Sequence, residues 1–198
     1  MSIDKKYQKL DDISHVIASP GMYIGSIKPH TAIKWIVDEN KMVQQELTYN
    51  PGFLKIFDEI ITNSVDESKR TGSKLTTIKV TIKDNTISIW DNGGIPVVKH
   101  TEHNEWIPEM IFSNLKSGSN FDDTEERSWA GTNGVGSTLT NIYSLEFTIS
   151  TCDGKNHFYQ TYKNNMRDRI DAKIKKSKLA HTEITFKPDF EKFGLEGI

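Results

Sequence analysis

The sequence is poor in cysteine, in long apolar runs and in surplus charge, and each shortage excludes a class of protein. Cys152 is the single cysteine, so an internal disulfide is impossible and no cysteine pair is present for a zinc site. Apolar runs stay far below the roughly 20 residues that a membrane-spanning helix needs. The N-terminal segment MSIDKKYQKLDDISHV lacks the apolar core of a signal peptide. Lys and Arg number 25 against 27 Asp and Glu, and this net charge of −2 argues against a wholly basic surface that coats nucleic acid.

The 198 residues suit one domain, or one domain with extensions. Helical spacing of apolar residues predicts helices over 11–18, 53–70, 107–115 and 135–143. Alternating apolar and polar residues predict strands over 35–37, 43–49, 75–83, 85–90, 145–152, 157–162 and 182–186. In the longest helix, Leu54, Phe57, Ile61 and Val65 line one side. Because helices are mixed with hairpin-linked strands, the expected fold class is a layered α+β fold.

The first candidate for chemistry is a polar stripe on the helix over 53–70. Glu59, Asn63, Asp66 and Arg70 are spaced by four, three and four positions, so they share one face. A solvated face is the plain interpretation of such a stripe. The functional interpretation makes Glu59 a general base and Asn63 an oxygen ligand of Mg²⁺, which needs few protein ligands because it keeps water and substrate phosphates. Periodicity alone leaves both open.

The second candidate is the turn Asp91-Asn92-Gly93-Gly94-Ile95-Pro96, directly after a predicted strand. An ordinary Asx-Gly turn explains this pattern as well. In the functional interpretation, the Asp91 carboxylate accepts a hydrogen bond from an exocyclic amine such as that of adenine. The glycines let the backbone approach the ring closely, and Ile95 gives an apolar contact to the base.

Two further segments come later in the chain. The stretch 131–138 holds Gly131, Gly134 and Gly136 just before a predicted helix, so backbone N–H groups and the helix N-terminus form a cradle for an anion. It matches neither the Walker A pattern nor the Rossmann fingerprint, and a flexible loop is the alternative. The strand over 182–189 is by itself only a strand closed by Pro188, and its interest lies in its order after the other three.

Taken in order, these elements resemble the GHKL ATPases, the superfamily of gyrase-type topoisomerases, heat-shock chaperone ATPases, histidine kinases and MutL mismatch-repair proteins. The shared pattern is a helix with Glu-x-x-x-Asn, a strand ending in Asp-x-Gly, a Gly-x-x-Gly-x-Gly loop and a late strand with Thr. Further segments resemble the ATPase domain of type IIA DNA topoisomerases of eukaryotic, viral or phage type: 22–26, 51–60, 108–112, 119–123, 133–136, 141–144 and 186–189. The resemblance implies a Bergerat fold over 1–198, a mixed, mostly antiparallel sheet covered on one face by helices. It also implies an N-terminal arm at 1–25 and an ATP lid at 116–132.

The resemblance implies ATP and Mg²⁺ as cofactors and gives individual residues their roles. Glu59 polarises the water that attacks the γ-phosphate, and Asn63 completes the Mg²⁺ shell. Asp91 reads the adenine amine, with Thr182 beside the same base edge, and Tyr7 caps the nucleotide of the other protomer. The residues implied in nucleotide binding are Asn63, Asp66, Asp91, Asn92, Ile95, Ser119, Asn120, Gly131, Thr132, Asn133, Gly134, Val135, Gly136, Ser137, Thr138 and Thr182.

The chain also departs from the family pattern. The Asp91 turn is one residue short, Thr138 stands where eukaryotic members usually carry Lys, and His181 precedes Thr182 where Gly is common. The resemblance implies that the family's transducer and DNA cleavage domains lie outside this sequence. We therefore expect ATP-gated homodimerisation that is weak in isolation, slow turnover and no DNA cutting by this chain alone. DNA and the cleavage domain are expected partners through the full-length enzyme. The implied location is cytoplasmic in a bacterial or phage setting and nuclear in a eukaryote, without secretion or membrane contact.

Other interpretations stay open at this point. A MutL-like or chaperone-like member, acting as a nucleotide-gated dimerisation module with little turnover, is the main alternative. A histidine kinase is disfavoured because few residues precede Glu59 to hold a phospho-acceptor domain. The Lys-rich and Arg-rich segment 163–178 is interpreted as solvated strands, with a DNA-facing surface as the alternative.

Overall fold

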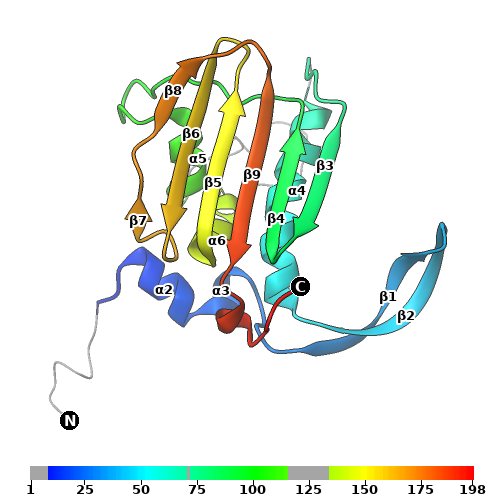
Figure 1. Ribbon diagram of the computed structural model, residues 1–198. Coiled ribbons are helices and arrows are strands. Elements are labelled where there is room, and N and C mark those ends of the chain that lie inside the picture. Colours follow the sequence, from blue (N-terminus) through cyan, green and yellow to red (C-terminus); the bar gives the residue numbers. More distant parts are fainter. Residues whose placement is uncertain (1–8, 71, 116–133) are drawn as a thin grey trace, which may run out of the picture.

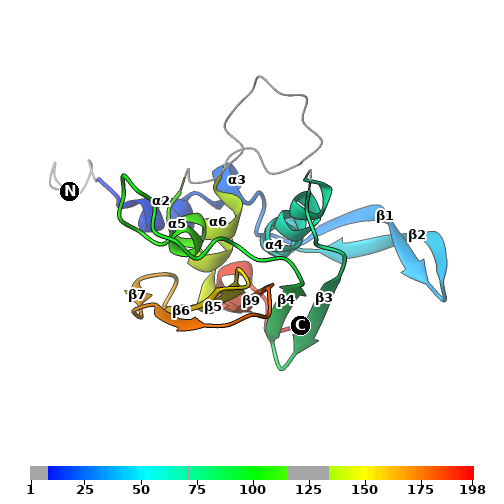
Figure 2. The same ribbon diagram turned by 90° about the horizontal axis from the view of Figure 1, so that it is seen from above.

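The body of the protein is a single sheet with helices on one face. The computed structural model describes residues 9–70, 72–115 and 134–198. Seven strands lie in the order β3-β4-β9-β5-β6-β7, with β8 paired to β6, and every recorded pairing is antiparallel. Figures 1 and 2 show α4, α5 and α6 over one face of this sheet, while the opposite face carries none of the described helices. The predicted α+β class, with helices over one face of a mostly antiparallel sheet, is confirmed.

The element bounds agree with most of the predicted segments, with shifted ends. The strands of the body are β3 (Ile78–Lys83), β4 (Thr86–Asp91), β5 (Ser144–Cys152), β6 (Asn156–Lys163), β7 (Asp168–Arg169), β8 (Lys173–Lys176) and β9 (His181–Pro188). A separate hairpin consists of β1 (His30–Asp38) and β2 (Lys41–Tyr49). The helices are α2 (Asp12–Ala18), α3 (Pro20–Tyr23), α4 (Pro51–Lys69), α5 (Ile107–Ser113) and α6 (Gly136–Ile142), followed by the 3₁₀ turn η1 (Phe190–Phe193). Neither α3 nor η1 was predicted. Among the described residues, no helix has the length and apolar character needed to cross a membrane.

The longest helix, α4, begins where the sequence supplies a cap. The Asn50 side chain accepts a hydrogen bond from the Phe53 backbone N–H at 3.0 Å. Pro51 follows in the first turn, where its missing N–H is not needed. The amide of Asn50 also donates to the carbonyls of Ile27 at 2.6 Å and Phe193 at 3.0 Å. One buried side chain therefore fixes the start of α4 against two segments distant in sequence.

The most deeply buried line of α4 is not the one predicted. Ile56, Ile60 and Ser64 are buried, whereas Leu54 of the predicted line is 44% exposed. The other members of that line are only partly buried. The apolar arc of α4 is wide, so apolar spacing does not decide which row of residues points at the centre of the sheet.

The core fills the space between the sheet and the helices. The Phe147 ring of β5 lies between the rings of Phe112 in α5, at 5.9 Å, and Phe186 in β9, at 6.4 Å. Such rings supply a large share of the apolar area removed from water. Other buried residues of this core are Ile56, Ile60, Ile87, Ile89, Leu139, Ile142, Ile149, Phe158 and Ile184.

Buried side-chain hydrogen bonds join the three main helices. Thr140 Oγ1 of α6 donates to the carbonyl of Ile56 in α4 at 2.8 Å. Asn141 Nδ2 of α6 donates to the carbonyl of Phe112 in α5 at 3.0 Å. Thr140 and Asn141 are fully buried, so water cannot replace either bond. The position of α6 relative to α4 is therefore set by specific bonds as well as by packing.

The described part of the predicted N-terminal arm packs on the body. The side chain of Asp11 caps α2, and Val16 and Ile24 are buried in the core. Tyr143 Oη donates to the carbonyl of Val16 at 2.9 Å. Tyr7 and the rest of 1–8 lie outside the described residues. An arm that reaches the other protomer therefore stays a prediction for residues 1–8 only.

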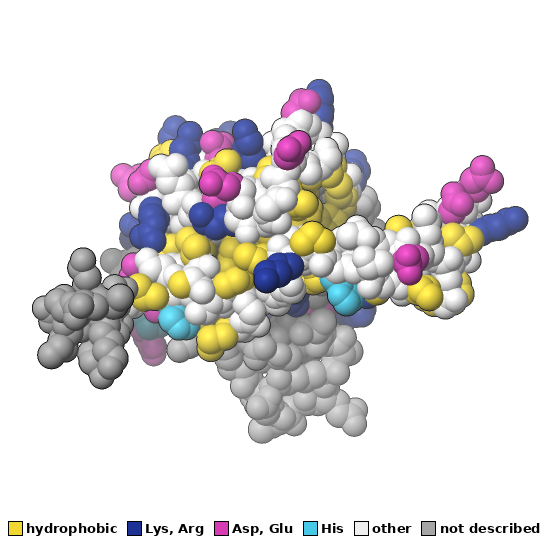
Figure 3. All heavy atoms as spheres, turned by 90° about the horizontal axis from the view of Figure 1, so that it is seen from below, with side chains coloured by type: hydrophobic (Ala, Val, Ile, Leu, Met, Phe, Trp, Pro, Cys, Tyr) yellow, Lys and Arg dark blue, Asp and Glu magenta, His cyan; other side chains and the backbone are white. Residues whose placement is uncertain are grey.

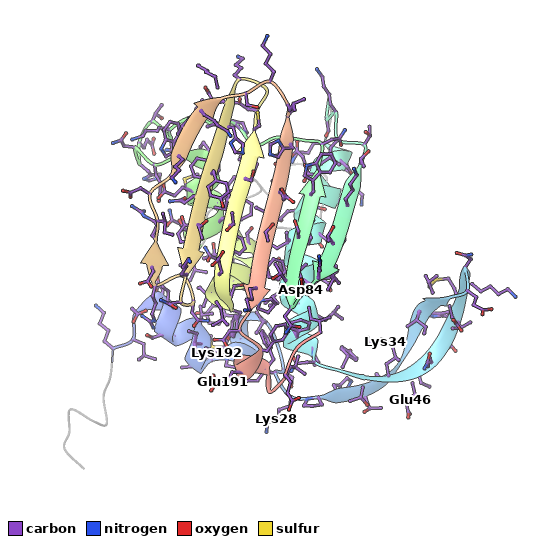
Figure 4. The ribbon with its side chains drawn as sticks, viewed as in Figure 1. Lys28, Lys34, Glu46, Asp84, Glu191 and Lys192 are labelled. Carbon is purple, nitrogen blue, oxygen red and sulfur yellow. The ribbon has the colours of Figure 1, made fainter. Side chains whose placement is uncertain are left out.

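The hairpin β1–β2 projects from the body (Figure 1). Its apolar side chains Ile33, Trp35 and Val37 are 67%, 62% and 70% exposed. Seen from below, hydrophobic side chains occupy both this hairpin and the underside of the body (Figure 3). Figure 4 places Lys34 and Glu46 on the projecting strands, apart from Asp84 on the body.

The basic segment 163–178 lies at the edge of the sheet opposite β3. All residues of β7 and β8 are exposed, and Arg169 forms an ion pair of 2.6 Å with Glu109. The exposure of β7 and β8 fits both solvated strands and a DNA-facing surface, so both interpretations stay predictions.

Candidate functional site

Asp91 ends β4, and its carboxylate is held from two sides. Ser64 Oγ of α4 donates to Oδ2 at 2.7 Å, and the Gly93 N–H donates to Oδ1 at 2.9 Å. Asp91 is buried, and this burial raises the pKa of its carboxyl, while hydrogen bonds from Ser64 and from the Gly93 and Thr182 backbones and the charge of His181 act to lower it. The result is a carboxylate of fixed orientation beside the helix that carries Glu59.

The glycines after Asp91 allow close packing of the turn. A β-carbon at Gly94 would overlap the carbonyl oxygen of Cys152 at the end of β5. A β-carbon at Gly93 would lie 3.0 Å from Asp91 Oδ1 and 3.1 Å from Leu75. Glycine is therefore needed here because the turn packs closely against β5, whether or not a base is bound.

Asn92 faces away from this carboxylate. Its Oδ1 accepts hydrogen bonds from the N–H groups of Thr76 and Thr77, each at 2.9 Å, and its Nδ2 donates to Thr76 Oγ1 at 3.1 Å. The side chain thus joins the turn to the segment before β3. These hydrogen bonds use the polar atoms of the Asn92 side chain within the protein. Its contact with ribose or phosphate stays a prediction.

Two threonines and a backbone N–H form a wall next to Asp91. Thr182 is the register partner of Asp91 in β9, and its Oγ1 lies 3.0 Å from Thr151 Oγ1. Thr151 Oγ1 also accepts from the Ile95 N–H at 3.1 Å. The Ile95 side chain is partly buried against the core. The structure therefore brings Asp91, Thr182 and Ile95 together, as predicted from widely separated segments.

Glu59 lies on α4 opposite the start of α6. A β-carbon at Gly136 would overlap its carboxylate, so this close approach requires glycine. Glu59 also forms an ion pair with Lys55, one turn earlier on the same helix. The Glu59 side chain is 20% exposed. A carboxylate within reach of solvent is therefore placed at the first turn of α6.

Asn63 makes the second contact between α4 and the start of α6. Its Nδ2 donates to Ser137 Oγ at 3.0 Å, which leaves Oδ1 as the oxygen that a cation would meet. No side chain caps the N-terminus of α6 in the described part of the chain. Glu59 and Asn63 thus face the helix end that the glycine pattern identified as an anion cradle.

Part of the predicted cradle is placed and part lies outside the described residues. Gly134 has the left-handed φ of 59°, and Val135 leads directly into α6. Thr138 is fully buried, and its Oγ1 donates to the Asn114 carbonyl at 3.1 Å. This hydroxyl is directed toward the end of α5, so any phosphate contact falls to the backbone of Thr138. Ser119, Asn120, Gly131, Thr132 and Asn133 lie outside the described residues.

The polar stripe of α4 is not a single solvated face. Asp66 is only 5% exposed, so the plain interpretation fails for this residue. Ser64, also buried, contacts Asp91 and was not among the predicted site residues. Its signal in the sequence is a small polar residue in line with Ile56 and Ile60, a position where an apolar side chain is expected.

The geometry fits Mg²⁺ only as a cation that brings most of its own ligands. Among the described residues, no group of three or more His, Cys, Asp or Glu could hold a metal. A single amide oxygen from Asn63, completed by water and phosphate oxygens, suits the sparse protein ligation that Mg²⁺ accepts. The donor set therefore suits a metal that arrives with a polyphosphate.

The chain matches a known family of ATPases. The model of the histidine kinase-, DNA gyrase B-, and HSP90-like ATPase family matches residues 49–192. The chain belongs to this ATPase family. The matched range runs from the last residue of β2 to η1 and contains all the placed site residues from Glu59 to Thr182.

Within the family, the chain is similar to type II topoisomerases. DNA topoisomerase 2 of Acanthamoeba polyphaga mimivirus is 46% identical over 207 residues, covering 98% of this chain and 16% of that protein. DNA topoisomerase 2-beta of Homo sapiens is 43% identical over 203 residues, covering 99% and 12%. The chain thus spans a small part of these curated relatives.

Solved structures give the same result. The ATPase region of Saccharomyces cerevisiae topoisomerase II matches with a TM-score of 0.92 at 37% identity, over 98% of this chain and 53% of that one. The ATPase and transducer domains of DNA topoisomerase II from Balamuthia mandrillaris match with a TM-score of 0.91 at 39% identity, over 98% and 52%. The chain corresponds to about half of each solved chain and shares its fold.

Proposed function

We propose that this domain binds ATP with Mg²⁺ and hydrolyses it, as the ATPase domain of a type II DNA topoisomerase. The observation that carries the proposal is the placement of α4, which presents Glu59 and Asn63 to the start of α6 and Ser64 to Asp91. Asp91, the proposed acceptor for the base, and Glu59, the proposed hydrolytic carboxylate, are therefore linked through α4. A nucleotide held at its base would be positioned relative to Glu59, which is how positioning accelerates phosphoryl transfer.

At the base end, Asp91 accepts a hydrogen bond from the exocyclic amine of adenine. The wall formed by Thr151, Thr182 and the Ile95 backbone lies beside it. Asp66, buried on α4, supports this end of the pocket. A carboxylate buried among fixed donors is a stronger acceptor than one in water, because little reorganisation is needed when the amine arrives.

At the phosphate end, the backbone of 134–138 contacts the triphosphate, together with Asn133 and with Ser119, Asn120, Gly131 and Thr132 of the proposed lid. Asn63 Oδ1 holds Mg²⁺, which when bound neutralises charge on the phosphate oxygens. Glu59 orients a water and accepts its proton as the water oxygen bonds to the γ-phosphorus. The bond from that phosphorus to the bridging oxygen breaks, giving ADP and phosphate.

The test uses two Glu→Gln variants of the same helix. Glu59→Gln should retain ATP binding and reduce hydrolysis about 100-fold or more, because the proton acceptor is removed while the shape is kept. Glu67→Gln is the matched control, since Glu67 pairs with Arg70 at the far end of α4. Binding is followed by calorimetry and turnover by phosphate release. Equal turnover of the Glu59 variant and the control would refute the hydrolytic assignment.

A second candidate is a nucleotide-gated dimerisation module with little turnover. The Lys55 ion pair favours it, because the ammonium group occupies a carboxylate oxygen of Glu59 that an attacking water would need. Light scattering with a non-hydrolysable ATP analogue separates the two functions. Dimer formation without measurable phosphate release by the wild type would favour the module, and release above that of Glu59→Gln would favour the ATPase.

Assembly with other components is part of the same proposal, and the similarity to type II topoisomerases supports it. Dimerisation on ATP binding, and action on DNA through a cleavage domain, belong to the proposal of a type II topoisomerase role. They are tested by adding the remaining domains to this chain and measuring DNA strand passage.

A further inference from the structure

A buried serine on α4 ties the two ends of the site together. Ser64 is 7% exposed, and its Oγ donates to Asp91 Oδ2 at 2.7 Å. It directly follows Asn63, which contacts the start of α6. An apolar residue at position 64 would continue the buried row of Ile56 and Ile60 without burying a polar group, which costs free energy. The serine is thus a polar group placed where packing alone does not call for one.

The bond from Ser64 fixes which way the carboxylate faces. A carboxylate has about four acceptor positions. One on Oδ2 is used by Ser64 and one on Oδ1 by the Gly93 N–H. Because these donors come from α4 and from the turn after β4, the carboxylate cannot rotate without losing one of them. The Thr182 backbone adds a further hydrogen bond, and the acceptor positions that remain are those available to a ligand.

The same bond also determines what the carboxylate can recognise. An ionised carboxylate accepts hydrogen bonds only, whereas a protonated carboxyl can donate one. Burial raises the pKa of Asp91, and the hydrogen bond from Ser64 opposes this and favours the ionised form. Such a group attracts an amino group on a purine and repels a carbonyl oxygen at the same position. Without the serine hydroxyl, a freely rotating or protonated carboxyl could donate to that oxygen.

We propose that Ser64 is a positioning residue that makes the site selective for 6-aminopurine over 6-oxopurine nucleotides by fixing the Asp91 carboxylate as an acceptor. This inference rests on the proposed function, because it assumes that Asp91 meets the base. It adds a residue and a selectivity to that function. The discrimination is exerted through Asp91, since Ser64 itself touches only the carboxylate.

The experiment compares ADP and IDP, which differ in the substituent at position 6 and in the proton that the 6-oxo base carries on N1, and which are not consumed during the measurement. Calorimetry gives the affinity of each for the wild type, Ser64→Ala, Ser64→Thr and Ser68→Ala. Ser68 is the matched control, because it is an exposed serine of the same helix whose hydroxyl bonds to the Val65 carbonyl. The threonine variant keeps the hydroxyl and should restore the wild-type preference.

The wild type should favour ADP strongly. Ser64→Ala should bind ADP about tenfold more weakly while IDP affinity is unchanged or improved, so that the preference falls about tenfold. Ser68→Ala should keep both affinities. A preference retained in Ser64→Ala, or an equal loss for both nucleotides, overturns the inference and leaves Ser64 as a packing residue.

Failure of the inference and failure of the proposed function are distinguishable. If the wild type binds neither ADP nor ATP, the proposed function fails, and this selectivity fails with it. If the wild type binds ADP and Asp91→Ala does not, the base pocket stands whatever Ser64 does. Should Ser64→Ala unfold, Ser64→Cys has a similar size and only a weak S–H donor. It should then show a reduced preference, and an unchanged one overturns the inference.

Discussion

Two hairpins of this molecule are closed by the same kind of turn, yet only one of them has a strand with buried residues. In β1–β2 the turn residues Glu39 and Asn40 have φ of 44° and 66°, and in β3–β4 Asp84 and Asn85 have φ of 50° and 60°. Positive φ at both positions is favoured in two-residue hairpins because it matches the twist of the strands. Turn chemistry is therefore equal in the two hairpins and does not explain their different burial.

The difference comes from the strand pattern and the next neighbour. Alternate residues of β4 are buried, and β4 pairs with β9 along its second edge. The strands β1 and β2 show no such alternation and form a sheet of their own. A strand with one apolar face suits a sheet covered on one side, whereas β1 carries exposed apolar groups. Local sequence thus sets strand pairing, while burial, and with it the placement of Asp91, depends on distant partners.

The largest predicted contrast between the hairpins concerns two isoleucines. Ile89 in β4 is 1% exposed and Ile33 in β1 is 67% exposed. Ile89→Ala should lower the free energy of unfolding by about 2–5 kcal/mol, because it leaves a cavity in the core. Ile33→Ala should change it by less than about 0.5 kcal/mol. Urea denaturation measures both, and an equal loss would mean that the projecting hairpin belongs to the cooperative core.

A smaller loss of stability is expected from a change in the turn after β4. The β1–β2 hairpin has no corresponding turn packed against the body. Gly94→Ala places a methyl group against the Cys152 carbonyl, so the turn must shift, at a loss of about 1–3 kcal/mol in stability. ADP affinity should fall as well, because the same turn supplies the Gly93 donor to Asp91.

Gly21→Ala is the control for this substitution. A β-carbon at Gly21 meets nothing within 4 Å, and the residue lies within α3. Its replacement should leave stability unchanged or raise it slightly. A Gly94 variant as stable as the Gly21 variant, with unchanged ADP affinity, would show that the turn adapts freely.

Elements with strong local signals could be predicted from the sequence. The cap formed by Asn50 and Pro51 identified the start of α4, and the Asp84-Asn85 turn identified the β3–β4 hairpin. The pairing of Asp91 with Thr182 could not be derived from periodicity, because it joins segments about half the chain apart. Their common site was predicted through family resemblance alone.

Two features of the site could not be predicted from the sequence, because both depend on the direction in which a side chain points. Thr138 follows the glycine pattern, but its place in the first turn of α6 directs its hydroxyl to Asn114. Ser64 was missed because the polar stripe was drawn through Asn63, one position earlier. Burial on a wide apolar arc depends on where neighbouring helices lie, and the sequence of α4 does not contain that information.

The smallest expected effect compares two cross-strand threonine pairs. Thr31 and Thr48 join β1 to β2 with hydroxyl oxygens 2.7 Å apart, and Thr148 and Thr161 join β5 to β6 at 3.0 Å. Removing one partner of such a pair changes stability by about 0.2–1 kcal/mol. Thr161→Ala should lower the global free energy of unfolding by this amount, because β6 unfolds with the body.

For Thr48→Ala, the global transition should not move, and faster hydrogen exchange should appear only at the amides of β1 and β2. An isolated two-stranded sheet opens on its own, because few tertiary contacts hold it closed. Exchange measured on both variants in native buffer therefore tests whether the hairpin is a separate unit. If Thr48→Ala instead weakens the whole domain as much as Thr161→Ala does, the β1–β2 hairpin and the body differ in exposure but not in cooperativity.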